Sequence, residues 1–344
     1  MDTVQYLDDH GKPLRDLPLS NEELLQGYRA LCRARQFDER ALVLQRQGRL
    51  GVYPPFRGQE AAQVGVTLCL EASKDWLCPS YRETAAAITF GMPLSKLILS
   101  WRADPAGWRI PDSVNMIQFY IPIATQIPQA AGLAHAERLK GSGAVVAAFI
   151  GDGGTSEGDF HEGLNFASVF DAPLLIVVQN NGWAISVPTK KQMKVQRVAL
   201  KAQGYGIPGV VVDGNDLVAV WSAAREAAAR ARNGEGPTLI EAITYRVAPH
   251  TSSDDPGRYR TEEETERWIR RDPILRMKNC LTHLELWSEN QEAELTEELE
   301  GEFLAAVEEA DQAPAPRPWE IVEQVYAEMH ADQQAAWNYL RGEP

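Results

Sequence analysis

The segment AVVAAFIGDGGTSEGDFHEG, residues 144–163, decides the fold class. Its first seven residues, Ala144–Ile150, are all apolar or small, and they lead directly into Gly-Asp-Gly-Gly. An apolar run that ends at glycines is typical of a buried strand followed by a tight turn. Asp152 stands between the glycines, so its carboxylate must be satisfied either by water or by a bound ligand.

Three further apolar segments, Leu174–Gln179, Val210–Val212 and Leu239–Tyr245, alternate with helical patterns such as DLVAVWSAAREAAARARNG. Continuous apolar strands separated by helices predict an α/β fold, a parallel sheet with helices on both faces. Ligands of such sheets bind beyond the carboxyl ends of the strands. The glycine turn lies at one of these ends.

Helical patterns flank this core on both sides. A capping box of Ser20 and Glu23 opens a helix that reaches about Gly48. Further helices are expected from about Gln59 and over 83–90, 94–101 and 126–140, with a short extended piece at DWLCPS and irregular chain over 102–122. We expect an N-terminal helical extension over 1–125, a ligand-binding core over 126–260 and a helical C-terminal region over 261–344, together forming one compact unit.

The charge balance argues against two classes of partner. The 344 residues include 34 Lys and Arg against 48 Asp and Glu, a net charge of -14, whereas nucleic acids and anionic membranes require basic surfaces. No apolar run reaches the roughly 18 residues of a membrane span, and the first residues resemble no targeting signal. The four cysteines form no CxxC pair, which favours reduced thiols. We expect a cytoplasmic protein with no nucleic acid or membrane partner.

The glycine turn fits neither common phosphate-binding motif. A P-loop requires a lysine, and none occurs between Lys140 and Lys190. The dinucleotide fingerprint G-x-G-x-x-G fits Gly151 and Gly153, but Ser156 replaces the third glycine. Asp152 would also repel a pyrophosphate, so an anionic ligand at this turn requires a cation beside the carboxylate.

The next strand supplies a second group of oxygen donors. LLIVVQNNGWAIS ends in Asn180 and Asn181, and 26 residues, Gly154–Gln179, separate these asparagines from the GDG element. A carboxylate and an amide oxygen are hard donors suited to Mg²⁺, which also takes substrate phosphates as ligands. GDG followed by NN at this spacing closely resembles the thiamine diphosphate motif.

The resemblance extends over about Leu19 to Asp272. The segments RQGRLG, PSYRE, IPIATQIPQAAG, GDGGTSEGDFHEGLNFASVF, QNNGWAISVPT, GEGPTLIEAITYR and PHTSSDDPGRYR follow one another as in a known family. They resemble the alpha subunits of heterotetrameric 2-oxo acid dehydrogenases, the decarboxylating first component of the pyruvate and branched-chain complexes. The fold is therefore expected to be the thiamine diphosphate-binding fold.

That family resemblance implies thiamine diphosphate and Mg²⁺ as cofactors and a small 2-oxo acid as substrate. The cofactor's thiazolium carbanion attacks the keto carbon, the ring accepts the electrons as CO₂ leaves, and the acyl group passes to a lipoyl group on the acyltransferase component. By resemblance, Asp152, the Asn181 side chain and the Trp183 backbone carbonyl hold the metal. The implied cofactor-binding residues are Tyr81, Arg82, Ile121, Ile123, Gly151, Asp152, Gly153, Gly154, Asn181 and His250.

Within this set the roles differ. The Tyr81–Arg82 pair is expected near the diphosphate, where an Arg fork suits phosphate oxygens. Ile121 and Ile123 are expected to support the bent cofactor, and Gly153 and Gly154 to let the backbone approach the diphosphate. His250 is the implied catalytic residue, either contacting the diphosphate or assisting acyl transfer to lipoate.

The loop around His250 carries further expectations. Its framework residues by resemblance are Arg246, Asp254, Asp255, Tyr259 and Arg260, and its hydroxyls that could be phosphorylated are Thr251, Ser252 and Ser253. We expect His135 and His161 to be structural. Ser80 and Gln179 stand where some branched-chain relatives carry Gln and Arg, so the corresponding cofactor contacts are not implied here.

One required group is missing from the chain. Activation of thiamine needs a carboxylate on the aminopyrimidine, and in this family a glutamate of the beta subunit provides it. We therefore expect an obligate beta subunit in an alpha2-beta2 heterotetramer. Two alternatives stay open: a branched-chain rather than a pyruvate enzyme, and a catalytically silent assembly subunit. A transketolase-type enzyme would need its second cofactor domain in the same chain, and the order of motifs does not support it.

Overall fold

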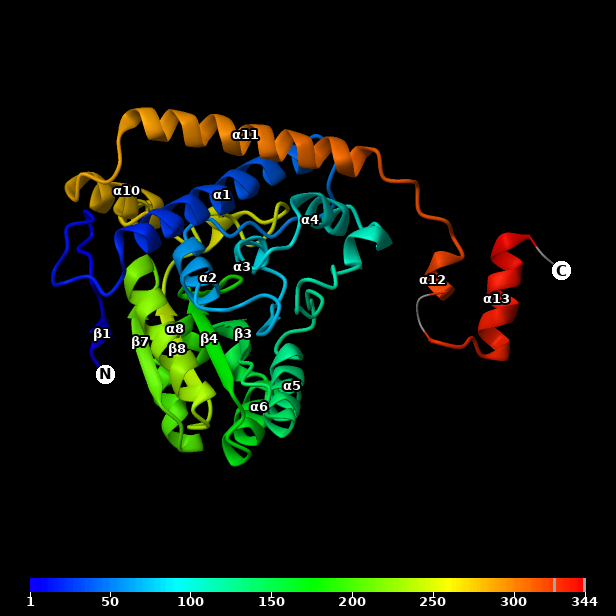
Figure 1. The fold of residues 1–344 in the computed structure, drawn as a ribbon, viewed down its shortest axis with the longest axis horizontal. Helices are drawn as coiled ribbons and strands as arrows, with labels where there is room; N and C mark the ends of the chain where they lie inside the picture. The colour runs from blue at the N-terminus through cyan, green and yellow to red at the C-terminus, as the bar shows by residue number, and fades with distance from the viewer. Residues whose placement is uncertain (324–325, 343–344) are drawn as a thin grey trace.

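Six parallel strands form the sheet at the centre of the molecule (Figure 1), in the order β1-β7-β8-β4-β3-β2. This computed structural model describes residues 1–323 and 326–342. The strands are β1 (Thr3–Val4), β2 (Trp76–Cys78), β3 (Val146–Gly151), β4 (Leu174–Asn180), β7 (Gly209–Asp213) and β8 (Thr238–Ile243). The expected α/β class with a parallel sheet and helical ends is confirmed.

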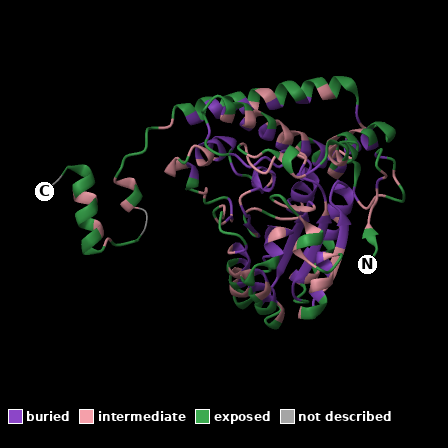
Figure 2. Ribbon diagram, turned by 180° about the vertical axis from the view of Figure 1, so that it is seen from behind, coloured by how far each residue is buried: buried purple, intermediate pink, exposed green. Residues whose placement is uncertain are grey.

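Helices cover both faces of the sheet, and the alternation along each strand decides which face a side chain meets. Ala147 and Phe149 of β3 pack into a core with α1 (Asn21–Arg46), α4 (Leu94–Trp101) and α8 (Leu217–Arg232). Val146 and Ile150 pack on the opposite face against α5 (Gln126–Lys140) and α6 (Gly158–Val169). The central strands β3, β4 and β8 are therefore buried on both faces, as Figure 2 shows.

The other helices pack around these elements or lie beyond them, and several add buried side chains to the same core. They are α2 (Glu60–Thr67), α3 (Thr84–Thr89), α7 (Thr189–Gln192), α9 (Glu262–Ile269), α10 (Pro273–His283), α11 (Glu289–Asp311), α12 (Glu320–Glu323) and α13 (Ala331–Arg341). The long α11 lies along α1, whereas α12 and α13 extend away from the body of the molecule (Figure 1). No helix in the described part of the chain could span a membrane.

Local signals place the helix ends. Ser20 and Glu23 form the capping box of α1: the Ser20 hydroxyl accepts from the Glu23 amide, and the Glu23 carboxylate accepts from the Ser20 amide. The expected helix over 126–140 has those bounds, because Gly141 adopts a left-handed conformation, φ 62°, directly after it.

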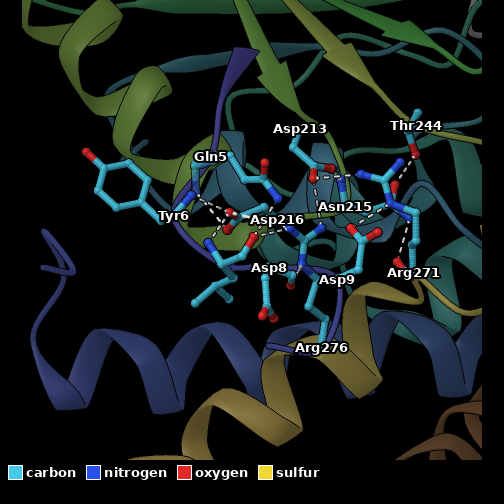
Figure 3. Close-up of polar contacts among 12 residues, drawn as sticks. Gln5, Tyr6, Asp8, Asp9, Asp213, Asn215, Asp216, Thr244, Arg271 and Arg276 are labelled. Carbon is cyan, nitrogen blue, oxygen red and sulfur yellow. Dashed lines mark hydrogen bonds and ion pairs between the residues drawn. The ribbon is translucent and has the colours of Figure 1, made fainter. Parts of the chain in front are cut away.

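The N-terminal segment joins the sheet, which its sequence does not indicate. β1 pairs with β7 and forms one edge of the sheet, and the amides of Tyr6 and Leu7 both donate to the buried Asp216 carboxylate at 2.7 Å (Figure 3). Arg276 donates to the Asp8 carbonyl at 2.7 Å and pairs with Asp213 at 2.9 Å. β1 and β2 both lie within residues 1–125, where the sequence predicts a helical extension, and they form the two edges of the sheet.

A small antiparallel hairpin follows β4. Its strands, β5 (Trp183–Ala184) and β6 (Val187–Pro188), lead into α7. Gly182, with φ 83°, lets the chain leave β4 directly after the asparagine pair. The hairpin therefore lies at the carboxyl edge of the central sheet.

Candidate functional site

A cavity of about 620 Å³ opens at the carboxyl ends of β3 and β4. The two strand ends are neighbours, because Gly151 pairs with Gln179 in the parallel ladder. All eleven residues that the sequence implied for the cofactor and the metal line this cavity: Tyr81, Arg82, Ile121, Ile123, Gly151, Asp152, Gly153, Gly154, Asn181, Trp183 and His250. Segments up to about 170 residues apart in the sequence are thus brought to one place.

Packing explains two of the glycines in the turn. A Cβ at Gly153 would lie 2.7 Å from the Ala184 Cβ, and a Cβ at Gly154 would lie 2.6 Å from the Ile150 side chain. At Gly151 a Cβ would meet nothing within 4 Å, because this residue faces the open cavity. Gly153 and Gly154 are therefore required by the protein's own packing, independently of any ligand.

Asp152 is a buried carboxylate at the cavity floor. Its Oδ2 accepts a hydrogen bond from the Thr189 hydroxyl at 2.7 Å. Burial raises the pKa of Asp152, and the bond from Thr189 partly counters that rise. A cation bound beside Asp152 would favour its ionised form.

The Asn181 side chain is held in one orientation. Its Nδ2 donates to Gln59 Oε1 at 2.9 Å, and its Oδ1 accepts from the Trp183 amide at 3.1 Å. Gln59 also donates through Nε2 to Gln179 Oε1 at 3.1 Å. The amide oxygen of Asn181 is therefore fixed by α2 and by the start of the hairpin.

Glu83 accepts hydrogen bonds at the far end of the side-chain amides of Asn181, Gln59 and Gln179. Its carboxylate accepts from Gln179 Nε2 at 2.6 Å and from the Ser80 amide at 2.7 Å. Burial raises the pKa of Glu83, against the effect of these hydrogen bonds and of Arg82. Glu83, Gln179, Gln59 and Asn181 thus form a continuous buried chain of hydrogen bonds beside the cavity.

Arg82 connects the His250 loop to the opposite wall. One terminal nitrogen donates to the Pro55 carbonyl at 2.7 Å; the other lies 3.0 Å from His250 Nδ1 and 2.9 Å from the His250 carbonyl. Because a guanidinium only donates, His250 Nδ1 accepts, and the neutral ring carries its proton on Nε2. Burial, Arg82 and Arg246 lower the pKa of His250 to about 4. His250 is therefore neutral near pH 7.

The loop that carries His250 is held by several of the expected residues. Asp254 accepts from the His250 amide at 2.8 Å and from the Tyr259 hydroxyl at 2.5 Å. Arg246 donates to the Ile185 carbonyl at 2.9 Å, and Arg260 donates to the Ala248 carbonyl at 3.0 Å. Asp255 instead caps the short helical turn that begins at Pro256. These contacts tie both ends of the loop to the hairpin and to its own backbone.

The hydroxyl-bearing part of the loop meets a second segment at the cavity mouth. The Ser252 amide donates to the Tyr53 carbonyl at 2.9 Å, and the Tyr53 amide donates to the Ser252 hydroxyl at 3.3 Å. Thr251 lines the cavity and lies 3.1 Å from the Ser253 hydroxyl. Whether any of these hydroxyls is phosphorylated stays a prediction.

The upper wall of the cavity is apolar and open. Ile121 and Ile123 are 65% and 44% exposed although they line the cavity, and Ile185 is 55% exposed. The Tyr81 ring lies edge-on to the His250 ring, with the centroids 6.1 Å apart. Because these isoleucines line the cavity and are also exposed, the cavity is open to the surface on their side.

The donor set fits Mg²⁺ better than a softer metal. Among the described residues, no three His, Cys, Asp or Glu side chains lie together as a metal site. Asp152, Asn181 and the Trp183 carbonyl supply only oxygen donors, and Mg²⁺ takes few protein ligands together with phosphates and water. Holding the metal at these three residues stays a prediction.

Four polar residues of the site could not be recognised from the sequence. Gln59 and Glu83 stand just before α2 and α3, where no periodicity marks them. Thr189 and Gln192 lie in the short α7; Gln192 donates to the Asp152 carbonyl at 2.6 Å. The available signal was that Glu83 and Thr189 fall inside the segments PSYRE and QNNGWAISVPT, and that Gln59 and Gln192 lie near the predicted motifs.

The two histidines expected to be structural lie outside the cavity lining. His135 packs against the rings of Phe166 and Phe170, with centroid separations of 5.7 and 4.6 Å. His161 lies on α6 beside Tyr205, 6.2 Å between ring centroids. The site chemistry therefore does not involve either ring directly.

Comparison with known proteins gives consistent matches. The dehydrogenase E1 component family matches residues 28–319. A Staphylococcus aureus protein named pyruvate dehydrogenase E1 component subunit alpha is 42% identical over 330 residues, covering 95% of this chain and 89% of its own length. A Mycobacterium tuberculosis protein named 3-methyl-2-oxobutanoate dehydrogenase subunit alpha is 43% identical over 352 residues, covering 100% and 94%. The two relatives are similar to this chain to the same degree.

Proposed function

The chain belongs to the dehydrogenase E1 component family, and on that basis we propose that it is the alpha subunit of a thiamine diphosphate- and Mg²⁺-dependent 2-oxo acid dehydrogenase. The observation that carries the proposal is the meeting of Asp152 and Asn181 at the carboxyl ends of adjacent strands. When bound, thiamine diphosphate supplies the carbanion and the electron sink for decarboxylation.

In this proposal, the residues of this chain bind the metal and the diphosphate and hold the cofactor in position. Asp152, Asn181 and the Trp183 carbonyl would hold Mg²⁺ and, through it, the diphosphate. Gln59 and Glu83 keep the Asn181 amide in place, and Gly151 leaves the space that the ligand needs. Ile121 and Ile123 offer an apolar wall to the bent cofactor.

His250 is the proposed catalytic residue. Its Nδ1 is held by Arg82, so Nε2 carries the proton of a neutral ring that lines the cavity. A neutral imidazole can donate a hydrogen bond from Nε2 to an oxygen of the diphosphate or of the acyl group, and so orient that group for transfer to a lipoyl acceptor. Arg82 acts here as a positioning residue.

Pyruvate is the proposed substrate, supported by the segments RQGRLGVY, PDSVNMI and GDGGTSEGDFHEG. A branched-chain 2-oxo acid is the second candidate, favoured by IATQIPQA and SSDDP and by the apolar residues Val52, Trp101 and Ile121 in the cavity wall. One or two methylenes change the barrier by only about 1–3 kcal/mol, so few side chains decide between them.

We further propose a beta subunit that closes the cavity and an acyltransferase that receives the acyl group, in a cytoplasmic alpha2-beta2 assembly. Besides Asp152, two carboxylates line the cavity. Glu83 is committed to Ser80 and Gln179, and Glu157 belongs to the same turn as Asp152. Neither stands apart to activate an aminopyrimidine, which supports a carboxylate from the partner. The four cysteines are free thiols, in keeping with a reducing compartment.

The test is reconstitution of the chain with its beta subunit. We expect decarboxylation of 2-oxo acids by the complex and little or none by the isolated alpha chain, and a higher kcat/KM for pyruvate than for 2-oxoisovalerate. Turnover by the isolated, monodisperse alpha chain would overturn the proposal that the beta subunit completes the active site. Calorimetry showing no binding of thiamine diphosphate and Mg²⁺ to the complex would favour a non-catalytic assembly subunit instead.

A further inference from the structure

One long segment of this acidic chain contains no acidic residue. Residues 172–212 include no Asp or Glu, although the whole chain has 48 of them and a net charge of -14. The cations of this segment are Lys190, Lys191, Lys194, Arg197 and Lys201. A positive segment of this length stands out against the negative field of the rest of the protein.

Four of these cations, at positions 190–197, follow the hairpin that lies at the carboxyl edge of the sheet. In the described chain, none of Lys190, Lys191, Lys194 and Arg197 forms an ion pair, whereas Lys201 turns inward and donates to the Thr155 carbonyl at 2.5 Å. Lys190, Lys191 and Lys194 are exposed. The same segment carries three exposed apolar side chains, Ile185, Val187 and Val195, of which Ile185 lines the cavity. We name the surface of residues 185–197 the basic rim.

The basic rim is attached directly to the floor of the cavity. The Thr189 hydroxyl donates to Asp152 Oδ2 at 2.7 Å, and Gln192 Nε2 donates to the Gly153 carbonyl at 2.9 Å. Ile185, at its start, lines the cavity. A molecule that binds the rim therefore stands at the mouth of the site and beside the residues that the metal requires.

We propose that the basic rim is the docking surface for the domain that carries the lipoyl acyl acceptor, and that this domain presents carboxylates to Lys191 and Lys194. The inference rests on the proposed function, because an acyl group made in the cavity must leave on an acceptor whose carrier stands at the mouth. Charge complementarity identifies the carrier's surface as acidic.

The composition of the rim favours a transient partner over the permanent beta subunit. Lysine is depleted in stable protein interfaces, where its flexible chain and hydrated charge are costly to bury. Unpaired surface lysines act mainly on the rate of encounter, which electrostatic steering raises and salt reduces. A carrier that must bind and leave in every turnover needs this kind of contact.

The test compares two double variants of the reconstituted complex, each losing two positive charges. K191Q/K194Q neutralises the basic rim. K74Q/K140Q neutralises two exposed lysines that precede β2 and β3, at the opposite edge of the sheet. The substrate is a lipoylated acyltransferase domain, and a parallel assay with ferricyanide as electron acceptor measures decarboxylation without that domain.

We expect K191Q/K194Q to lower kcat/KM for the lipoyl domain about 10-fold at low ionic strength and to weaken its salt dependence. The control variant and the ferricyanide rate should stay near wild type. An unchanged kcat/KM, or an equal fall in K74Q/K140Q, would overturn the proposal. Loss of the heterotetramer in gel filtration of K191Q/K194Q would also overturn it, by assigning the rim to the beta subunit. Failure of the proposed function is distinguishable, since wild type would then show no ferricyanide reduction.

Discussion

Arg82 holds His250 at two points, 3.0 Å from its ring Nδ1 and 2.9 Å from its carbonyl oxygen, although the residues are 168 positions apart. The guanidinium sets the tautomer and the orientation of the ring, and together with burial it keeps the ring neutral by lowering its pKa. It also ties the ring to Pro55 on the other side of the cavity. The guanidinium of Arg82, which lies just before α3, therefore ties the His250 loop to the rest of the cavity wall.

The first prediction concerns the protonation of His250. Its pKa of about 4 lies below the ordinary value of 6.5, so the ring stays neutral from pH 8 down to about pH 5. The unfolded chain takes up this proton below pH 6.5 while the folded protein does not, so His250 lowers stability as pH falls from 6.5 towards 4. An NMR titration of the ring should show no transition near pH 6.5, and the Arg82→Gln variant should move the midpoint upward. A titration midpoint of the His250 ring near pH 6.5 in the wild-type protein would contradict the burial of this ring beside Arg82.

The second prediction separates binding from stability at Asp152. Asp152→Asn removes the one carboxylate proposed for Mg²⁺, so the Mg²⁺-dependent affinity of the complex for thiamine diphosphate should fall by about 100-fold or more. Burial already disfavours the charged form of Asp152, so the ligand-free Tm should not fall. Calorimetry and thermal unfolding give the two readouts.

Asp171→Asn is the matched control for Asp152→Asn. Asp171 is exposed, lies outside the cavity and has φ 43°, a conformation that asparagine tolerates. The complex that carries Asp171→Asn should bind the cofactor with the affinity of the wild-type complex. An Asp152→Asn complex that binds cofactor normally would contradict the proposed metal site.

The third prediction uses the two kinds of glycine in the turn. Gly153→Ala would place a methyl group 2.7 Å from the Ala184 Cβ and should cost about 1–3 kcal/mol of unfolding free energy. The double variant Gly153→Ala with Ala184→Gly should recover most of that loss, because it removes the opposing methyl group. Gly151→Ala meets nothing within 4 Å and should change stability by less than about 0.5 kcal/mol. Denaturant unfolding measures all three; no rescue by Ala184→Gly would refute the packing explanation.

The fourth prediction tests the buried amide chain. Glu83→Ala leaves the Ser80 amide and Gln179 Nε2 without their acceptor, at about 1–3 kcal/mol for each buried unsatisfied group. Because Gln179 bonds to Gln59, and Gln59 to Asn181, Mg²⁺ affinity should also fall, by about 10- to 100-fold.

Glu157→Ala provides the comparison for stability. Glu157 also lines the cavity but is exposed, so its removal should change the unfolding free energy by less than about 0.5 kcal/mol. Equal effects of the two substitutions would show that Glu83 does not anchor the network.

Much of the fold followed from local patterns. The apolar runs of β3, β4, β7 and β8 indicated a buried parallel sheet, the capping box at Ser20 marked the start of α1, and the helical pattern over 126–140 matched α5. β1 and the β5–β6 hairpin were not expected, because elements of two residues carry no measurable period. Their positions depend on partners elsewhere, Asp216 for the N-terminal segment and Asp152 for the hairpin and α7.

By itself the sequence determined which residues stand at the ends of adjacent strands. The apolar runs specify the strands, and 26 residues between the GDG and NN elements suffice for one crossover helix, so Asp152 and Asn181 had to meet. Only the tertiary structure decided how those side chains are held. Gln59 reaches Asn181 across 122 positions, Gln179 reaches Glu83 across 96, and Thr189 reaches Asp152 across 37. The physical reason is that strand and helix periodicity reports only near neighbours along the chain, whereas a buried polar side chain bonds to whichever donor or acceptor the packing of distant elements brings beside it.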